Sequence, residues 1–120
     1  MLSCLKNFNR GFFSMPYYPL ADVFQTKKGY EIQMELPGVK KDDITIDLDQ
    51  GILNITATKK LKKDESVKQI HTEIEYGTIS REFNLPSNVE TEGMEAVLKD
   101  GVLTLSIPRK EKSKVEVKIL

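Results

Sequence analysis

The residues that could do chemistry are few in this 120-residue chain, and they do not cluster in the sequence. There is one histidine, His71, and one cysteine, Cys4, whereas a structural zinc site takes about four nitrogen or sulfur ligands. Two pairs of carboxylates, Asp42-Asp43 and Asp47/Asp49, have the residue type of a general acid and base. No nucleophile accompanies them, and acidic residues are mostly solvated. We therefore expect no metal site and no enzymatic activity.

Nucleotide binding and nucleic-acid binding are not indicated either. The turn glycines are isolated, so none forms a glycine-rich phosphate loop. They are Gly29, Gly38, Gly51, Gly77 and Gly101. The 18 basic and 18 acidic residues cancel, whereas a nucleic-acid binder needs a basic excess. We expect no cofactor and no nucleic-acid partner.

The sequence contains no candidate membrane span, since no apolar run approaches the roughly 20 residues that a spanning helix needs. Residues 1–20 contain Lys6 and Arg10 but no acidic residue, a composition that faintly resembles a transit peptide. These two residues also interrupt any apolar core of a secretory signal. A single cysteine allows no internal disulfide, so nothing requires an oxidising compartment. We expect a cytoplasmic protein.

Residues 21–108 have the period-two alternation of β-strands, in short runs separated by turn residues. In residues 30–36 apolar and polar side chains alternate strictly, and Pro37-Gly38 ends the run. Asp100-Gly101 is a strong hairpin signal between two further runs. The remaining runs cover residues 44–48, 53–57, 79–85, 94–98 and 102–107. Many short strands without a helical period favour an all-β sandwich or barrel.

Three appendages flank or interrupt this body. Residues 1–20 contain five of the nine aromatic residues without strand alternation, and their apolar spacing allows a short amphipathic helix. The five are Phe8, Phe12, Phe13, Tyr17 and Tyr18. The insert 59–76 begins as a charged loop and ends in an alternating run, which can form a strand. The tail 109–120 is polar at first and then alternates at Val115, Val117 and Ile119.

Charge is distributed unevenly between these parts. The three appendages are net positive, and the sandwich body is net negative. Loops and tails often collect lysine without consequence. Alternatively, basic appendages of one subunit are steered onto the acidic bodies of its siblings, which would raise the rate and specificity of association. The sequence leaves both readings open.

Three segments resemble the alpha-crystallin domain of bacterial and plant small heat-shock proteins. They are Leu36-Pro-Gly-Val39, the run from Tyr76 to Pro86, and Ala96-Val-Leu-Lys-Asp-Gly-Val-Leu103. The resemblance runs from about Pro19 to Pro108, with a matching tail. It implies an immunoglobulin-like sandwich of two antiparallel sheets. It also implies an ATP-independent chaperone, a homo-oligomer of dimers that holds partly unfolded proteins and passes them to ATP-dependent refolding chaperones.

The resemblance also implies a strand-exchanged dimer. The insert 59–76 would add its strand to the partner's sheet near Asp22 to Thr26, and Arg81 matches a family arginine near that interface. Since Glu73, Glu75 and Glu82 are nearby in sequence, we expect an ion pair for Arg81. The expected dimer residues are Ile70, Thr72, Ile74, Tyr76, Arg81, Val23 and Phe24.

The tail motif Val115-Glu-Val117 resembles the family's isoleucine-x-isoleucine motif, and Val117-Lys-Ile119 satisfies the same pattern. Alternate side chains of an added strand would fill pockets at a sheet edge of a neighbouring dimer. The expected groove residues are Ile44, Ile46, Leu48, Ala96 and Leu98. The alternative is that the tail forms a last strand of its own domain.

The aromatic residues of segment 1–20 are the expected client-binding residues, although burial inside the oligomer would explain them equally well. Two other classes of protein remain as alternatives. One is a co-chaperone-like sandwich that binds a folded partner. The other is a membrane-surface protein, for which Lys6 and Arg10 would supply only about 1 kcal/mol each.

Overall fold

The computed structural model describes residues 19–61, 63–111 and 116–120, and these residues form seven β-strands and one short 3-10 helix. The elements are β1 (Ala21–Gln25), β2 (Gly29–Glu35), η1 (Lys41–Asp43), β3 (Ile44–Asp49), β4 (Ile52–Lys59), β5 (Gly77–Asn84), β6 (Glu95–Lys99) and β7 (Val102–Pro108). They lie close to the alternating runs in the sequence. The aromatic residues Phe8, Phe12, Phe13, Tyr17 and Tyr18 lie outside the described residues.

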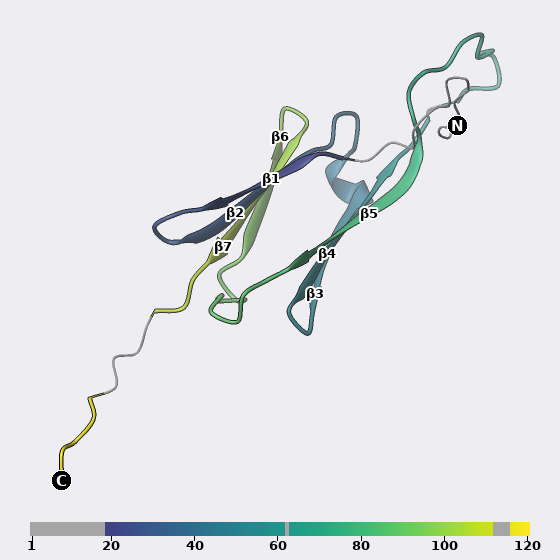
Figure 1. The fold of residues 1–120 in the computed structure, drawn as a ribbon. Helices are drawn as coiled ribbons and strands as arrows, with labels where there is room; N and C mark the ends of the chain where they lie inside the picture. Colours follow the sequence, from purple (N-terminus) through teal and green to yellow (C-terminus); the bar gives the residue numbers. More distant parts are fainter. Residues whose placement is uncertain (1–18, 62, 112–115) are drawn as a thin grey trace, which may run out of the picture.

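The strands form two antiparallel sheets that face each other as separate layers (Figure 1). One sheet has the order β1-β2-β7-β6, and the other has the order β3-β4-β5. The expected antiparallel β-sandwich is therefore confirmed. Each sheet has two edge strands, β1 and β6 in the first and β3 and β5 in the second.

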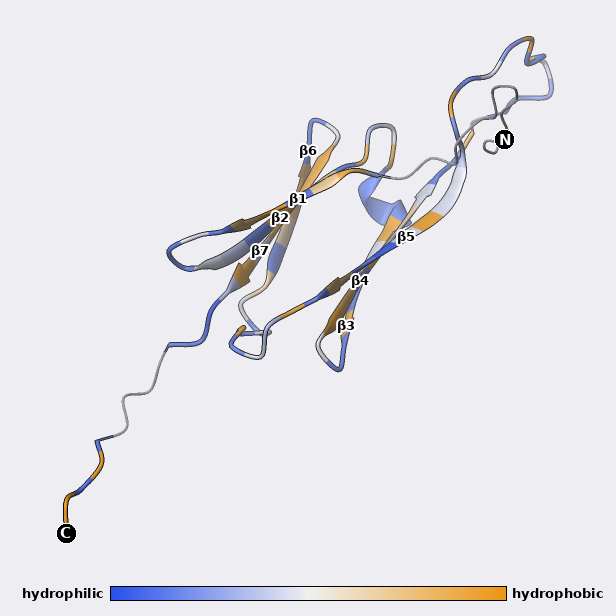
Figure 2. Ribbon diagram, viewed as in Figure 1, coloured by the Kyte–Doolittle hydropathy of each residue, from blue (hydrophilic) through white to orange (hydrophobic). Residues whose placement is uncertain are grey.

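The core comes from the central strands, whose inward side chains are fully buried. On β2 they are Ile32 and Met34, on β4 Leu53 and Ile55, and on β7 Leu103, Leu105 and Ile107. Figure 2 shows this alternation as orange and blue segments along single strands. Burying one such side chain stabilises the fold by about 1.5–3 kcal/mol, so the central strands hold the two sheets together.

Two tight turns set the register of the sheets. Asp100 and Gly101 connect β6 to β7, with φ values of 52° and 78°. Gln50 and Gly51 connect β3 to β4 with φ values of 50° and 78°. Positive φ at both central residues is the geometry of a type I′ hairpin. The Asp-Gly signal in the sequence thus corresponds to a real turn, which brings β6 to the sheet edge.

Gly29 is required where β2 meets β7. A Cβ atom at this position would lie 2.1 Å from the Ile107 carbonyl oxygen and 2.7 Å from the Arg109 amide nitrogen. We expect Gly29→Ala to lower the free energy of unfolding by about 1–3 kcal/mol through overpacking. Thermal unfolding followed by circular dichroism measures the change, with the neighbouring exposed residue as control in Lys28→Ala. Equal melting temperatures for both variants would contradict this reading.

Candidate interaction surfaces

An apolar groove lies between the edge strands β3 and β6. Two adjoining pockets of about 690 and 450 Å³ form it, and both include Ile46 and Ala96 in their walls. Leu48 lines the first pocket, whereas Ile44 and Leu98 line the second. The structure therefore brings together all five residues that the sequence assigned to a groove.

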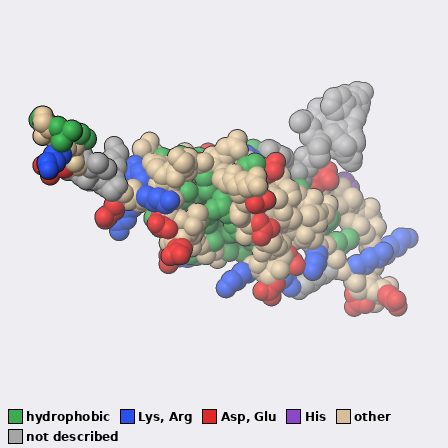
Figure 3. Space-filling model, turned by 90° about the horizontal axis from the view of Figure 1, so that it is seen from below, with side chains coloured by type: hydrophobic (Ala, Val, Ile, Leu, Met, Phe, Trp, Pro, Cys, Tyr) green, Lys and Arg blue, Asp and Glu red, His purple; other side chains and the backbone are tan. Residues whose placement is uncertain are grey.

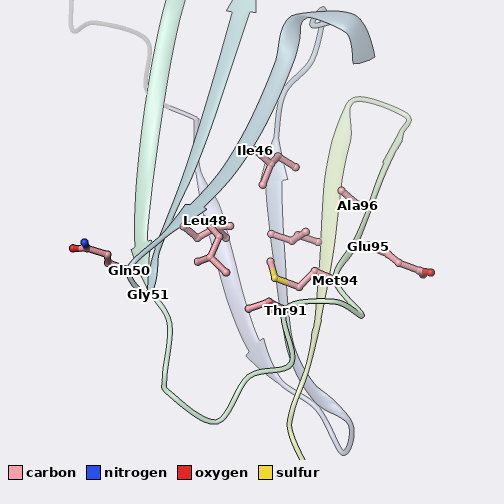
Figure 4. Close-up of a pocket in the computed structure, with 10 residues that line it drawn as sticks. Ile46, Leu48, Gln50, Gly51, Thr91, Met94, Glu95 and Ala96 are labelled. Carbon is pink, nitrogen blue, oxygen red and sulfur yellow. The ribbon is translucent and has the colours of Figure 1, made fainter.

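The close-up in Figure 4 shows how the first pocket is built. Ile46, Leu48 and Met94 point into the space between the strands, while Gln50 and Glu95 point outward. Met94 was not among the predicted groove residues. The signal was present in the sequence, because Met94 begins the alternating run 94–98 and shares a sheet face with Ala96.

Strand β1 presents a free backbone edge among the described residues. Its partner is β2, and the Glu35 amide donates to the Leu20 carbonyl at 3.0 Å, as the Thr26 amide does to the Gly29 carbonyl at 2.7 Å. Since hydrogen-bonding direction alternates along a strand, the backbone groups of Ala21, Val23 and Gln25 point away from β2. This edge can accept a further strand.

Side chains on β1 add apolar surface to this edge. Val23 is 58% exposed and Phe24 is 42% exposed, and they lie on opposite faces of the sheet. Figure 3 shows apolar side chains reaching the surface in the middle of one face of the molecule, with acidic and basic side chains around them. The sandwich thus leaves apolar area at its surface.

The insert leaves the body where β4 ends and returns where β5 begins. Lys59 and Gly77 are paired across these strands, so the insert protrudes as a loop from the end of a hairpin (Figure 1). Beyond Lys59, the last residue of β4, the described residues of the insert form no strand within the single chain. Ile70 is 92% exposed and Ile74 is 58% exposed. An alternating run without a neighbouring strand has nothing to bond its backbone to, and its apolar side chains stay in water.

His71 belongs to the same loop, as do two further expected dimer residues, Thr72 and Tyr76. The His71 Nε2 atom lies 2.7 Å from the Glu73 Oε2 atom, and both side chains are largely exposed. Thr72 is exposed in the same run, as is Tyr76. This histidine is therefore part of a solvated loop surface.

Arg81 makes contacts within its own chain that the sequence did not indicate. Its Nη1 atom donates to the Pro19 carbonyl at 2.7 Å, and its guanidinium lies 5.1 Å from the centre of the Phe83 ring. Pro19 is 62 residues away in the sequence. The expected ion pair of Arg81 with a nearby glutamate stays a prediction.

The first two residues of the tail 109–120 are hydrogen-bonded to the body. The Arg109 amide donates to the Lys28 carbonyl at 2.8 Å, and the Lys110 amide donates to the Asn88 carbonyl at 2.6 Å. The Arg109 Nη2 atom also donates to the Lys27 carbonyl at 2.8 Å. The chain is therefore attached to the body through Lys110.

Beyond this attachment, Val117 is 81% exposed and Ile119 is 94% exposed. Residues 116–120 lie away from both sheets and form no strand (Figure 1). In the described part of the tail, the alternative of a last strand in the domain's own sheets is thus not observed. Val115 lies outside the described residues.

The carboxylate pairs occupy ordinary surface positions. Asp43 forms an ion pair with Lys60 at 2.9 Å, while Asp47 and Asp49 are exposed on β3. Within residues 19–61, 63–111 and 116–120, no three or more His, Cys, Asp or Glu side chains are placed to hold a metal ion. The same residues contain no helix long and apolar enough to cross a membrane.

These features define a class of protein, an immunoglobulin-like antiparallel sandwich of the alpha-crystallin domain type. Residues 22–120 match the Hsp20/alpha crystallin family, and the chain belongs to this family. The resemblance carried by the three sequence motifs is confirmed. Membership of the small heat-shock proteins implies a chaperone role.

Relatives and solved structures agree with this assignment. The chain is 35% identical over 124 residues to small heat shock protein C2 of Rickettsia felis, which covers 93% of this chain and 80% of that protein. Heat shock protein 16.0 of Schizosaccharomyces pombe superposes with a TM-score of 0.73 at 30% identity, covering 87% of this chain and 97% of that one. A small heat-shock protein of Xylella fastidiosa, described as having a distinct high order structure, gives 0.71 at 28% identity and covers 87% and 96%.

Proposed function

We propose that this protein is an ATP-independent holdase, which binds partly unfolded proteins under stress and keeps them from aggregating. One observation carries the proposal: most of the large apolar side chains left exposed lie on or beside a free strand edge, on a protruding loop and on a tail. Examples are Val23 on the edge strand β1, Ile70 in the loop and Ile119 in the tail. Exposed apolar surface of this kind marks sites of protein–protein contact.

Assembly begins in this proposal with a dimer made by strand exchange. The insert 59–76 of one subunit pairs with the free edge of β1 in its partner. The outward backbone groups of Ala21, Val23 and Gln25 would then bond to the run from Ile70 to Tyr76. The exposed apolar side chains on both elements would be covered in the same step, which favours pairing over solvation.

Dimers assemble further through the tail. Its alternating residues, Val115 and Val117 or Val117 and Ile119, would enter the groove between β3 and β6 of a neighbouring dimer. The groove has two adjoining pockets, and alternate residues of an extended strand lie close enough to fill both. Each contact is weak, but several per assembly act together.

Clients bind to the aromatic residues of the N-terminal segment. They are Phe8, Phe12, Phe13, Tyr17 and Tyr18. Aromatic side chains contribute much apolar area at low cost in conformational entropy, and clients expose similar area when they unfold. The proposal includes no catalytic step and no cofactor. It places the protein in the cytoplasm, where ATP-dependent chaperones would refold the released clients.

Light scattering from a heated client protein tests the holdase activity. We expect an equimolar amount of this protein to suppress the scattering in the absence of ATP. The triple variant Phe8→Ser, Phe12→Ser, Phe13→Ser should lose most of this protection, because the client-binding apolar area is removed. Oligomer mass is measured in parallel. Scattering that is unaffected by the wild-type protein would contradict the holdase function. Full protection by an intact oligomer of the triple variant would exclude only Phe8, Phe12 and Phe13 as client-binding residues.

A further inference from the structure

The two long sides of the sandwich are built differently. On one side the edge strands β3 and β6 leave an open groove. On the other side lie β1 and β5, and here the Arg81 side chain crosses from one sheet to the chain entering the other. Its Nη1 atom donates to the Pro19 carbonyl at 2.7 Å. Arg81 thus links β5 to the residue two positions before β1.

Both partners of this hydrogen bond, the Arg81 side chain and the Pro19 carbonyl, are held in place by further contacts. The Arg81 guanidinium lies over the Phe83 ring at 5.1 Å, a distance at which a cation is attracted to an aromatic face. Pro19 is fully buried, and the next carbonyl, that of Leu20, accepts a hydrogen bond from Glu35. From Pro19 onward the chain is therefore fixed to the body.

Pro19 is also the point at which the N-terminal segment 1–18 joins the sandwich. We infer that Arg81 is a positioning residue that fixes where this segment leaves the body, beside the free edge of β1. This inference rests on the proposed role of the aromatic segment in client binding. The segment would then start from a fixed point, Pro19, two residues before β1 begins.

Limited proteolysis with chymotrypsin tests the link. Arg81→Met removes the donors and keeps an unbranched side chain, whereas Arg81→Lys keeps the charge without the planar guanidinium. Arg109→Met is the matched control, since Arg109 also donates from a guanidinium to a backbone carbonyl, that of Lys27 at 2.8 Å. Cleavage after Leu20 reports the junction, and cleavage after Leu105, which is buried in the central strand β7, reports general opening of the sandwich.

We expect Arg81→Met to raise cleavage after Leu20 about tenfold relative to cleavage after Leu105, the factor expected from losing one charge-assisted hydrogen bond. Arg81→Lys should give a smaller rise, and Arg109→Met should leave the ratio unchanged. Client protection should fall in the same order. A general loss of stability would raise both cleavages together. An unchanged ratio in Arg81→Met and Arg81→Lys would overturn the inference.

The outcome also separates this inference from the proposed function. If the triple serine variant loses protection but the Arg81 variants retain it, the aromatic segment binds clients without needing this anchor. If the triple serine variant retains protection, its three phenylalanines are not needed for client binding, and only the cleavage ratio still reports on Arg81. The inference stands or falls on that ratio in either case.

Discussion

Deletion of residues 62–74 is expected to convert the protein into a folded monomer. The deletion removes the run that would pair with the partner's β1, while β4 and β5 can still be joined across the paired residues Lys59 and Gly77. Light scattering coupled to size-exclusion chromatography measures the mass in solution. Circular dichroism checks that the sandwich remains folded.

A finer variant separates the alternating run from the rest of the insert. Ile70→Ser with Ile74→Ser removes two of the exposed apolar side chains on one face of the run. Val67→Ser is the control, because Val67 is 59% exposed in the same loop but precedes the run. We expect the double variant to weaken the dimer and the control to keep it. A deletion variant that remains a dimer would rule out strand exchange.

The second large effect is expected in the tail. Changing Val115 and Val117 to aspartate should leave a folded dimer and abolish larger species, because two charges would enter an apolar groove. Each buried valine would contribute about 1.5 kcal/mol or somewhat more, and several contacts per assembly multiply the loss. Mass in solution at physiological salt is the measurement, and Ser113→Asp in the polar spacer is the control.

Single variants of the tail determine the register of the motif. If Val115 and Val117 fill the pockets, Val115→Asp should disrupt assembly and Ile119→Asp should not. If Val117 and Ile119 fill them, the result is reversed. Large oligomers that survive the double valine change and the Ile119 change alike would show that another element connects the dimers.

The strands that could be predicted from sequence are those with one buried face. In β2 and β7 the alternation is strict because a packed layer lies on one side and water on the other. Strand β1 carries no comparable pattern, since Val23 and Phe24 on its two faces are both exposed. A sequence alternates where one face of a strand is buried. The edge strand β1 has little buried surface, so its sequence does not alternate.

Alternation indicated which groove residues share a face of each run, whereas the resemblance was needed to place the two runs at one groove. The full wall of the groove was not predictable, since Thr91 and Gly51 come from turns whose positions depend on the closed fold. No local sequence pattern indicated the contact between Arg81 and Pro19. Contacts between residues 62 positions apart arise from sheet packing, which a single sequence does not display.

The attachment of Arg109 and Lys110 to the body shortens the tether by which the tail would connect subunits in the proposed assembly. Four residues, 111–114, separate the last attached residue from Val115, and an extended chain spans at most about 3.3–3.6 Å per residue. The tether therefore reaches roughly 15 Å. A short tether keeps the tail motif at a high effective concentration near any groove within that radius. The motif cannot reach a groove that lies farther away. Tether length would then act as a ruler for the spacing of dimers, so that lengthening it would change the geometry of the assembly before it weakened any single contact.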